Sequence, residues 1–209
     1  MTDRRVAVIL FDGFELLDVF GPVELLFLTP GFTVGYYGPR PGPVSSSQGG
    51  QVVAEQAYDE LREPDILLVP GGIGTRRLVD DRAFLDWLRD TGRAANIVTS
   101  VCTGSGVLAA AGLLESYRAT SNKLSFGWAS SFGTTVDWVP TARWVQDRDR
   151  WTSSGVAAGM DMTAALIADL SGAEAAREAT VLAELEVHPD SAWDPFAAIH
   201  GLTAATGED

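Results

Sequence analysis

The stretch NIVTSVCTGSGVLAAAGLL, residues 96–114, decides the fold of this chain. Residues 96–101 form a short, β-branched, apolar run that predicts a buried strand, and residues 104–114 predict an apolar helix directly after it. Cys102, the only cysteine of the chain, lies at the turn between the two. A strand that leads straight into a helix is the repeating unit of an α/β fold.

The same alternation of apolar strands and helices runs along most of the chain. It favours a parallel sheet covered by helices on both faces, in which functional loops gather at the carboxyl ends of the strands. Residues 38–50 are rich in proline, glycine and serine, and we expect them to form a loop. The other predicted strands are residues 5–11, 32–37, 65–69, 117–121, 136–139, 143–146 and 151–153, and the other predicted helices are residues 15–28, 122–131, 157–170, 173–186 and a helix from Asp80 or Asp81 to about Arg93.

The sequence predicts a single α/β domain over residues 1–196. The 209 residues suffice for one large domain with a sizeable core, and they contain no internal repeat and no domain linker. The last residues, TAATGED, are polar, and we expect residues 197–209 to be a disordered tail.

Composition and charge narrow the classes of partner. The chain is 21% charged with a formal net charge of −13. Such an acidic chain repels phosphate backbones and anionic lipids, so nucleic acids and membrane surfaces are poor partners. The sequence contains no run of about 18 apolar residues, the length needed to span a membrane. The start MTDRRVAVILFDGF lacks the layout of a signal peptide. A single cysteine fits a reducing compartment, and we expect a cytoplasmic protein.

Cys102 has the context of a nucleophile. SVCTGSG resembles the nucleophile elbow of hydrolases, in which small residues, here Ser100 and Gly104, flank a nucleophile on a sharp, strained turn. The sulfur would lie at the start of the next helix, which favours a thiolate, and the backbone N–H of Thr103 would point toward the attacked atom. The alternative is an inert, buried thiol, which the elbow context disfavours.

Two further loops end predicted strands at the same sheet edge. In VPGGIG the consecutive glycines allow close backbone approach, and the N–H of Gly72 could join that of Thr103 as an oxyanion hole. In DGFELLDVFGP, Glu15 and Asp18 begin a helix. A buried carboxyl group beside Cys102 would have a raised pKa and could move protons, although charge compensation at the helix N-terminus is an alternative role. Apolar neighbours favour Asp18 over Glu15 for this role.

The two histidines, His188 and His200, both lie late in the chain and at no predicted strand end. A Cys–His–acid triad would require one of them to fold back onto the elbow, and we do not expect it. Two histidines so placed also make a catalytic zinc site improbable.

The three loops together resemble those of the ThiJ/PfpI superfamily, whose flavodoxin-like fold is similar to that of class I glutamine amidotransferases. The resemblance extends from about Val6 to Glu186. Within the superfamily, LLDVFGPVELL, VPGGIG, VTSVCTGSGVLAAAGLL and TSSGVAAGMDM are similar to segments of bacterial isocyanide (isonitrile) hydratases.

The resemblance implies a homodimeric enzyme that needs no metal or cofactor. Cys102 would add to the terminal carbon of R–N≡C to form a thioimidate, and Asp18 would act as general acid and base until an N-substituted formamide is released. Gly72 and Thr103 would supply backbone donors. The residues implied to line the substrate pocket are Ile73, Ser121, Asn122 and Val156.

One segment departs from the relatives. Many hydratase-like relatives carry Thr-His-Trp after the strand beyond the elbow, where this chain has Ser121, Asn122 and Lys123. This change removes a candidate triad histidine and disfavours protease or amidase activity. Two alternatives remain open, namely a glutathione-independent, glyoxalase-like conversion of methylglyoxal to lactate and a cysteine-based oxidation sensor. Glyoxalase-like relatives carry Glu in place of Asp18, which places that alternative second. A ligand-sensing half of a transcription regulator is disfavoured by the acidic charge.

Overall fold

The core of the fold is a seven-stranded sheet in the order β10-β11-β7-β6-β1-β2-β5, seen in a computed structural model that describes residues 3–203. Every neighbouring pair is parallel except β10 and β11 at one edge, so the predicted parallel-rich sheet is confirmed. The strands are β1 (Arg4–Ile9), β2 (Phe32–Gly38), β5 (Gln56–Ala57), β6 (Ile66–Val69), β7 (Ile97–Ser100), β10 (Trp144–Asp147) and β11 (Arg150–Ser153).

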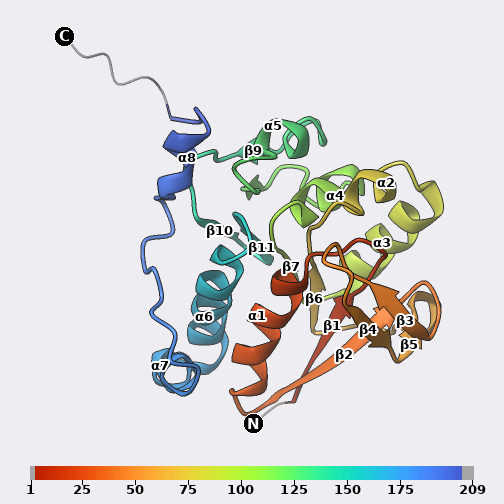
Figure 1. Cartoon of the computed structure of the whole chain (residues 1–209), viewed down its shortest axis with the longest axis horizontal. Coiled ribbons are helices and arrows are strands. Elements are labelled where there is room, and N and C mark those ends of the chain that lie inside the picture. The colour runs from red at the N-terminus through yellow and green to blue at the C-terminus, as the bar shows by residue number, and fades with distance from the viewer. Residues whose placement is uncertain (1–2, 204–209) are drawn as a thin grey trace.

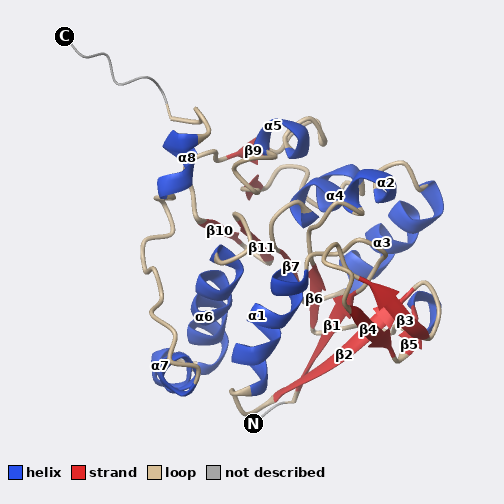
Figure 2. Ribbon diagram, viewed as in Figure 1, coloured by secondary structure: helices blue, strands red, loops and turns tan. Residues whose placement is uncertain are grey.

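Helices cover both faces of this sheet (Figures 1 and 2). One face carries α1 (Leu16–Phe27), α6 (Ala158–Ser171) and α7 (Ala173–Leu182), and the other carries α3 (Arg82–Ala94) and α4 (Gly104–Ala110). The shorter elements are β3 (Gly42–Ser45), β4 (Gln51–Ala54), η1 (Tyr58–Glu60), α2 (Thr75–Leu78), β8 (Arg118–Ala119), α5 (Phe126–Ala129), β9 (Asp137–Trp138) and α8 (Pro195–Ile199). Among the described residues, no helix is long and apolar enough to cross a membrane.

Side chains of β1 alternate between two apolar clusters, because successive residues of a strand point to opposite faces. Val6 and Val8 pack in the cluster formed with α1 and α6, whereas Ala7 and Ile9 pack in the cluster formed with α3 and α4. With both faces covered, β6 and the part of β1 from Val6 onward are apolar on both faces, which explains the continuous runs in the sequence.

Parallel pairing brings the ends of the central strands together. Val69 at the end of β6 pairs with Ser100 at the end of β7, which also pairs with Thr152 of β11. The three loops that follow β1, β6 and β7 therefore meet at one edge of the sheet, as the sequence predicts.

The predicted helix after Cys102 begins at Gly104 as expected but ends at Ala110. The N–H of Gly112 bonds to Ala109 O at 2.9 Å and that of Leu113 to Leu108 O at 2.9 Å, which is a Schellman motif. Gly112 has φ 75°, in the left-handed region that glycine adopts without steric cost. This glycine therefore ends the helix that the apolar pattern extended to residue 114.

Two local predictions are wrong. Residues 38–50 are not only a loop, because β3 pairs in antiparallel fashion with β4, a strand that was not predicted. This two-stranded ribbon lies outside the main sheet, where a proline such as Pro43 is tolerated. The predicted helix over residues 122–131 is reduced to the single turn of α5.

The expected disordered tail from residue 197 also needs correction. α8 extends to Ile199, and Ala197 is buried. The helix forms because Asp194 Oδ1 accepts a hydrogen bond from Phe196 N at 2.9 Å and Pro195 occupies the first turn. Residues 204–209 of the expected tail lie outside the described residues.

Gly104 is required by the close approach of α4 to the end of β6. A Cβ atom at this position would lie 2.3 Å from Val69 O and 2.8 Å from Pro70 O, both rigid backbone atoms. We expect Gly104→Ala to lower the free energy of unfolding by about 1–3 kcal/mol, measured by urea denaturation. The matched control is Gly127→Ala in α5, where a Cβ meets no atom within 4 Å. Equal stability of the two variants would contradict this packing argument.

Candidate active site

The turn at Cys102 is strained and held from several directions. Cys102 has φ 58°, which is uncommon for a residue with a side chain and costs about 1–3 kcal/mol. Its N–H donates to Ser154 O at 3.0 Å. Its carbonyl oxygen accepts from Ser105 Oγ at 3.2 Å and from Ser121 Oγ at 3.0 Å. These bonds fix the orientation of the elbow and confirm the expected sharp turn.

Gly71 is the point at which the three loops touch. A Cβ atom on Gly71 would lie 2.6 Å from Thr103 N and 2.8 Å from Asp18 Oδ2. Only a glycine leaves room for the carboxyl group of α1 and the elbow to approach the same backbone. This close contact therefore explains why residue 71 is a glycine.

Asp18 lies in the first turn of α1 and is completely buried. Its Oδ2 accepts a hydrogen bond from Gly71 N at 2.8 Å, and its Oδ1 has no hydrogen-bond partner among the described residues. Burial, reinforced by the charge of Glu15, raises the pKa of Asp18 to about 7, although the Gly71 N–H and Cys102 oppose the shift. The carboxyl group can therefore gain and lose a proton near neutral pH.

Cys102 is 7% exposed, and burial followed by the charge of Asp18 raises its pKa to about 12. The N–H groups of Thr103 and Val156 act in the opposite direction. Desolvation and the neighbouring carboxylate therefore act against the thiolate that the helix N-terminus is expected to favour. The two groups are coupled, because protonation of Asp18 removes the charge that opposes a thiolate.

The two predicted backbone donors, the N–H groups of Thr103 and Gly72, differ in the atoms that they contact. The N–H of Thr103 lies close enough to the Cys102 sulfur to lower its pKa. The N–H of Gly72 instead donates to Thr103 Oγ1 at 3.1 Å. Gly72 therefore orients Thr103 rather than presenting a free donor, which corrects its expected role.

A cavity of about 230 Å³ opens above Cys102. Ile73, Asn122 and Val156, three of the four residues expected at the substrate pocket, line this cavity. Ser121 does not, because it is buried beneath the elbow and holds the Cys102 carbonyl group. Glu15, the acid ranked below Asp18, also lines the cavity, and the lining residues that the sequence did not reveal are Arg76, Leu124 and Ser125. Arg76 follows the glycine loop by a few residues, but only the turn of α2 directs it to the cavity.

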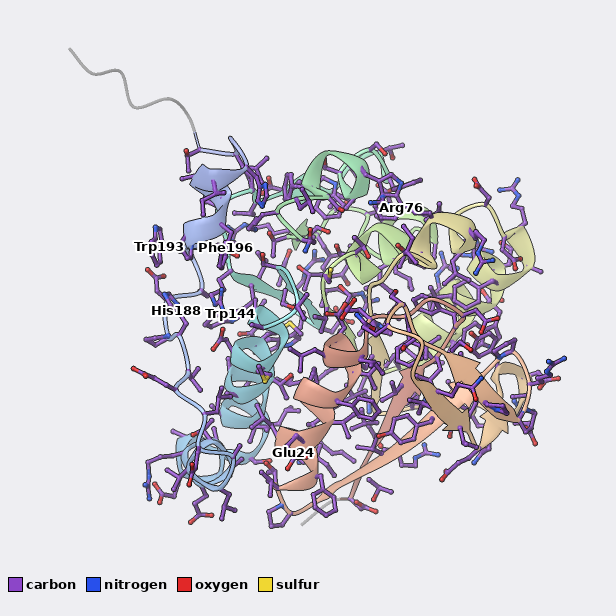
Figure 3. All side chains as sticks on the ribbon, in the orientation of Figure 1. Glu24, Arg76, Trp144, His188, Trp193 and Phe196 are labelled. Carbon is purple, nitrogen blue, oxygen red and sulfur yellow. The ribbon has the colours of Figure 1, made fainter. Side chains whose placement is uncertain are left out.

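Neither histidine is among the residues that line this cavity. The ring of His188 stacks on that of Trp193, with 5.4 Å between the ring centroids. Figure 3 shows both residues on the opposite side of the view from Arg76. His200 lines an adjoining cavity of about 280 Å³ with Lys123 and Asp194, and the two cavities share Asn122, Leu124 and Val156. Residues 3–203 also contain no cluster of histidine, cysteine and carboxylate side chains suited to a metal ion.

Comparison with known proteins agrees with this arrangement of loops. The profile of the DJ-1/PfpI family matches residues 4–169. The chain belongs to the DJ-1/PfpI family. The expected superfamily is therefore confirmed, together with its fold.

Members of the DJ-1/PfpI family that resemble this chain are named for different functions. An isonitrile hydratase from Pseudomonas putida is 34% identical over 192 residues, which cover 91% of this chain and 81% of the relative. The transcriptional regulator CdhR from Pseudomonas aeruginosa is 31% identical over 175 residues, or 80% of this chain and 51% of the regulator. Among solved structures, a ThiJ/PfpI family protein from Pseudomonas syringae matches with a TM-score of 0.82 and 32% identity, covering 90% of this chain and 78% of that chain.

Proposed function

We propose that this DJ-1/PfpI protein is a hydratase that adds water to an isocyanide, R–N≡C, to give an N-substituted formamide. The observation that carries the proposal is the juxtaposition of Cys102 with a buried Asp18 whose pKa is about 7. The similarity to an isonitrile hydratase supports the substrate class.

In the first step, the sulfur of Cys102 forms a bond to the terminal carbon of the isocyanide. The proton of the thiol passes to Asp18, and Asp18 delivers it to the same carbon. The product is a thioimidate, R–N=CH–S–Cys102. The carboxyl group is suited to this transfer because a general acid or base works best with a pKa near the working pH.

In the second step, Asp18 accepts a proton from a water molecule as the water oxygen bonds to the thioimidate carbon, and Asp18 then delivers this proton to the nitrogen. The carbon–sulfur bond of the tetrahedral adduct then breaks, and the hydroxyl proton returns to the sulfur through Asp18. The products are R–NH–CHO and the free thiol, so the net change is the addition of one water molecule. No histidine among the described cavity residues competes with Asp18 for this role.

The cavity is consistent with a small substrate. Its volume is about 230 Å³, and Ile73, Leu124 and Val156 supply apolar surface for the group R. The isocyanide group itself is uncharged and compact, so it can enter the buried end of the cavity beside Cys102.

The direct test is to incubate the protein with small alkyl and aryl isocyanides and to identify the products by mass spectrometry. We expect the N-substituted formamide, and in ¹⁸O-labelled water we expect one labelled oxygen atom in it. Failure to convert any of several isocyanides would contradict the proposed function.

A further inference from the structure

Arg76 of α2 lines the same cavity as Cys102. It is the only cationic side chain among the described residues that line this cavity. Figure 3 shows Arg76 beside α2 and α4. The proposed hydration steps do not involve this guanidinium group. The chain has a net charge of −13, so the presence of a cation in this cavity needs a physical explanation.

The guanidinium group is held in place before any ligand binds. Its Cζ lies 3.4 Å from the centroid of the Trp128 ring, and Nη2 donates to Ser125 Oγ at 3.0 Å. Stacking on an aromatic ring and a hydrogen bond restrict a side chain that is otherwise flexible. Binding a ligand therefore requires little further ordering of Arg76, which favours affinity.

The protein does not neutralise this charge. No carboxylate among residues 3–203 forms an ion pair with Arg76 within 4 Å. Its Nη1 is buried and has no hydrogen-bond partner among these residues. Burial lowers the pKa of Arg76, although the nearby Cys102 opposes this shift. An unpaired, buried donor costs free energy, and a ligand acceptor would remove part of that cost.

The acidic side chain of the cavity does not supply the missing partner. Glu15 also lines the cavity, but its Oε1 accepts a hydrogen bond from the side-chain amide of Gln48. Gln48 lies next to the ribbon of β3 and β4 in the chain and accepts in turn from Leu16 N. These contacts hold Glu15 at the start of α1, so the positive charge of Arg76 remains available.

We propose that Arg76 binds an anionic group on the molecule that Cys102 attacks, and that the preferred substrates are isocyanides bearing a carboxylate. A planar guanidinium matches a carboxylate in shape and charge, and it pairs with it through two hydrogen bonds. The isocyanide part of this statement rests on the proposed hydratase function, whereas recognition of the anion does not.

Alkylation of Cys102 tests anion recognition without reference to hydration. Iodoacetate and iodoacetamide react with the sulfur in the same way: a carbon–sulfur bond forms, iodide leaves, and the thiol proton is released to the solvent. They differ in the charge of the group that the cavity must receive. Cys102 is the only cysteine, so the mass of the intact protein reports its modification alone. For each variant, the rate constant with each reagent is divided by the rate constant of the same reagent with free cysteine. The normalised value for iodoacetate is then divided by the normalised value for iodoacetamide to give one ratio.

We expect Arg76→Met to lower the iodoacetate-to-iodoacetamide ratio about tenfold, because a nearby positive charge is removed. Arg76→Lys keeps the charge and should retain most of the wild-type ratio. The matched control is Arg77→Met, which removes the same charge one residue away at an exposed side chain outside the cavity. Arg77→Met should leave the ratio unchanged. An unchanged ratio in Arg76→Met, or an equal fall in Arg77→Met, would overturn the proposal.

Turnover of isocyanoacetate and of its neutral methyl ester then tests the substrate class. The ratio of kcat/KM for the acid over that for the ester should fall about tenfold in Arg76→Met. An equal ratio in the wild type and in Arg76→Met would overturn the assignment of carboxylate-bearing substrates. If neither isocyanide reacts, the hydratase function fails, and the alkylation ratio still decides whether Arg76 recognises anions.

Discussion

Replacement of Cys102 by alanine is expected to lower formamide formation by about 10⁴-fold or more, because the covalent intermediate can no longer form. The cavity and the fold should survive, since the substitution removes one buried atom at a position already held by backbone bonds to Ser154, Ser105 and Ser121. Circular dichroism and thermal unfolding of the variant check this point. The residual rate is read from product formation at saturating isocyanide.

Asp18→Asn tests the second half of the same mechanism. Asparagine can still accept the hydrogen bond from Gly71 N but cannot carry a proton between thiol, carbon and water. We expect kcat to fall about 10²–10⁴-fold, the range typical of a lost general acid or base. The matched control is Asp12→Asn, at an exposed aspartate that follows β1 and lies outside the cavity. Asp12→Asn should retain the activity of the wild type.

Two results would contradict this division of roles. Full activity in Asp18→Asn would transfer proton movement to another group, such as Glu15 at the cavity wall. Equal losses in Asp12→Asn and Asp18→Asn would show a general effect of charge or folding rather than catalysis.

The second large effect concerns stability. The pKa of Asp18 rises from 3.8 to about 7 on folding, mainly through burial. Between about pH 4 and about pH 7, the folded protein therefore keeps a proton that the unfolded chain has lost, so stability falls as the pH rises through this window. The penalty has an upper limit of about 4 kcal/mol and is complete above the folded pKa. Ionised Asp18 thus makes the functional protein less stable at neutral pH.

Asp18→Asn removes this penalty. We expect the variant to exceed the wild type in free energy of unfolding by an amount that grows by about 2–3 kcal/mol between pH 5 and pH 8. Urea denaturation of both proteins across this range measures the difference, which cancels the titration of all other groups. A difference that stays constant with pH, or that shrinks as the pH rises, would show that Asp18 is not a buried acid with a raised pKa.

Several parts of the fold could be predicted from the sequence because they depend on local patterns. The continuous apolar runs of β1 and β6 and the β-branched run of β7 predict buried strands, and the structure shows them. Asp81 was one of two expected caps for α3, and its Oδ1 accepts from Phe84 N at 3.0 Å. Small residues around Cys102 predict the strained turn. Each of these signals involves residues close together in the chain.

Other features depend on residues distant in the sequence. β3 and β4 form because two short segments can pair with each other beside the sheet, although residues 38–50 have the composition of a loop. Ser121 was expected at the pocket surface, but folding places its hydroxyl group under the Cys102 carbonyl. Arg76 reaches the cavity only because Trp128 and Ser125, about 50 residues later, form its support.

The sequence by itself determined the alternation of strands and helices, the elbow at Cys102 and the acid at the start of α1, because these follow from short-range periodicity and turn chemistry. Only the tertiary structure decided the protonation of the site and the lining of its cavity. A helix N-terminus alone favours a thiolate, but burial of Cys102 against Asp18 reverses that preference. Desolvation and the distance between charges depend on what the folded chain packs around each group, and no local pattern encodes them.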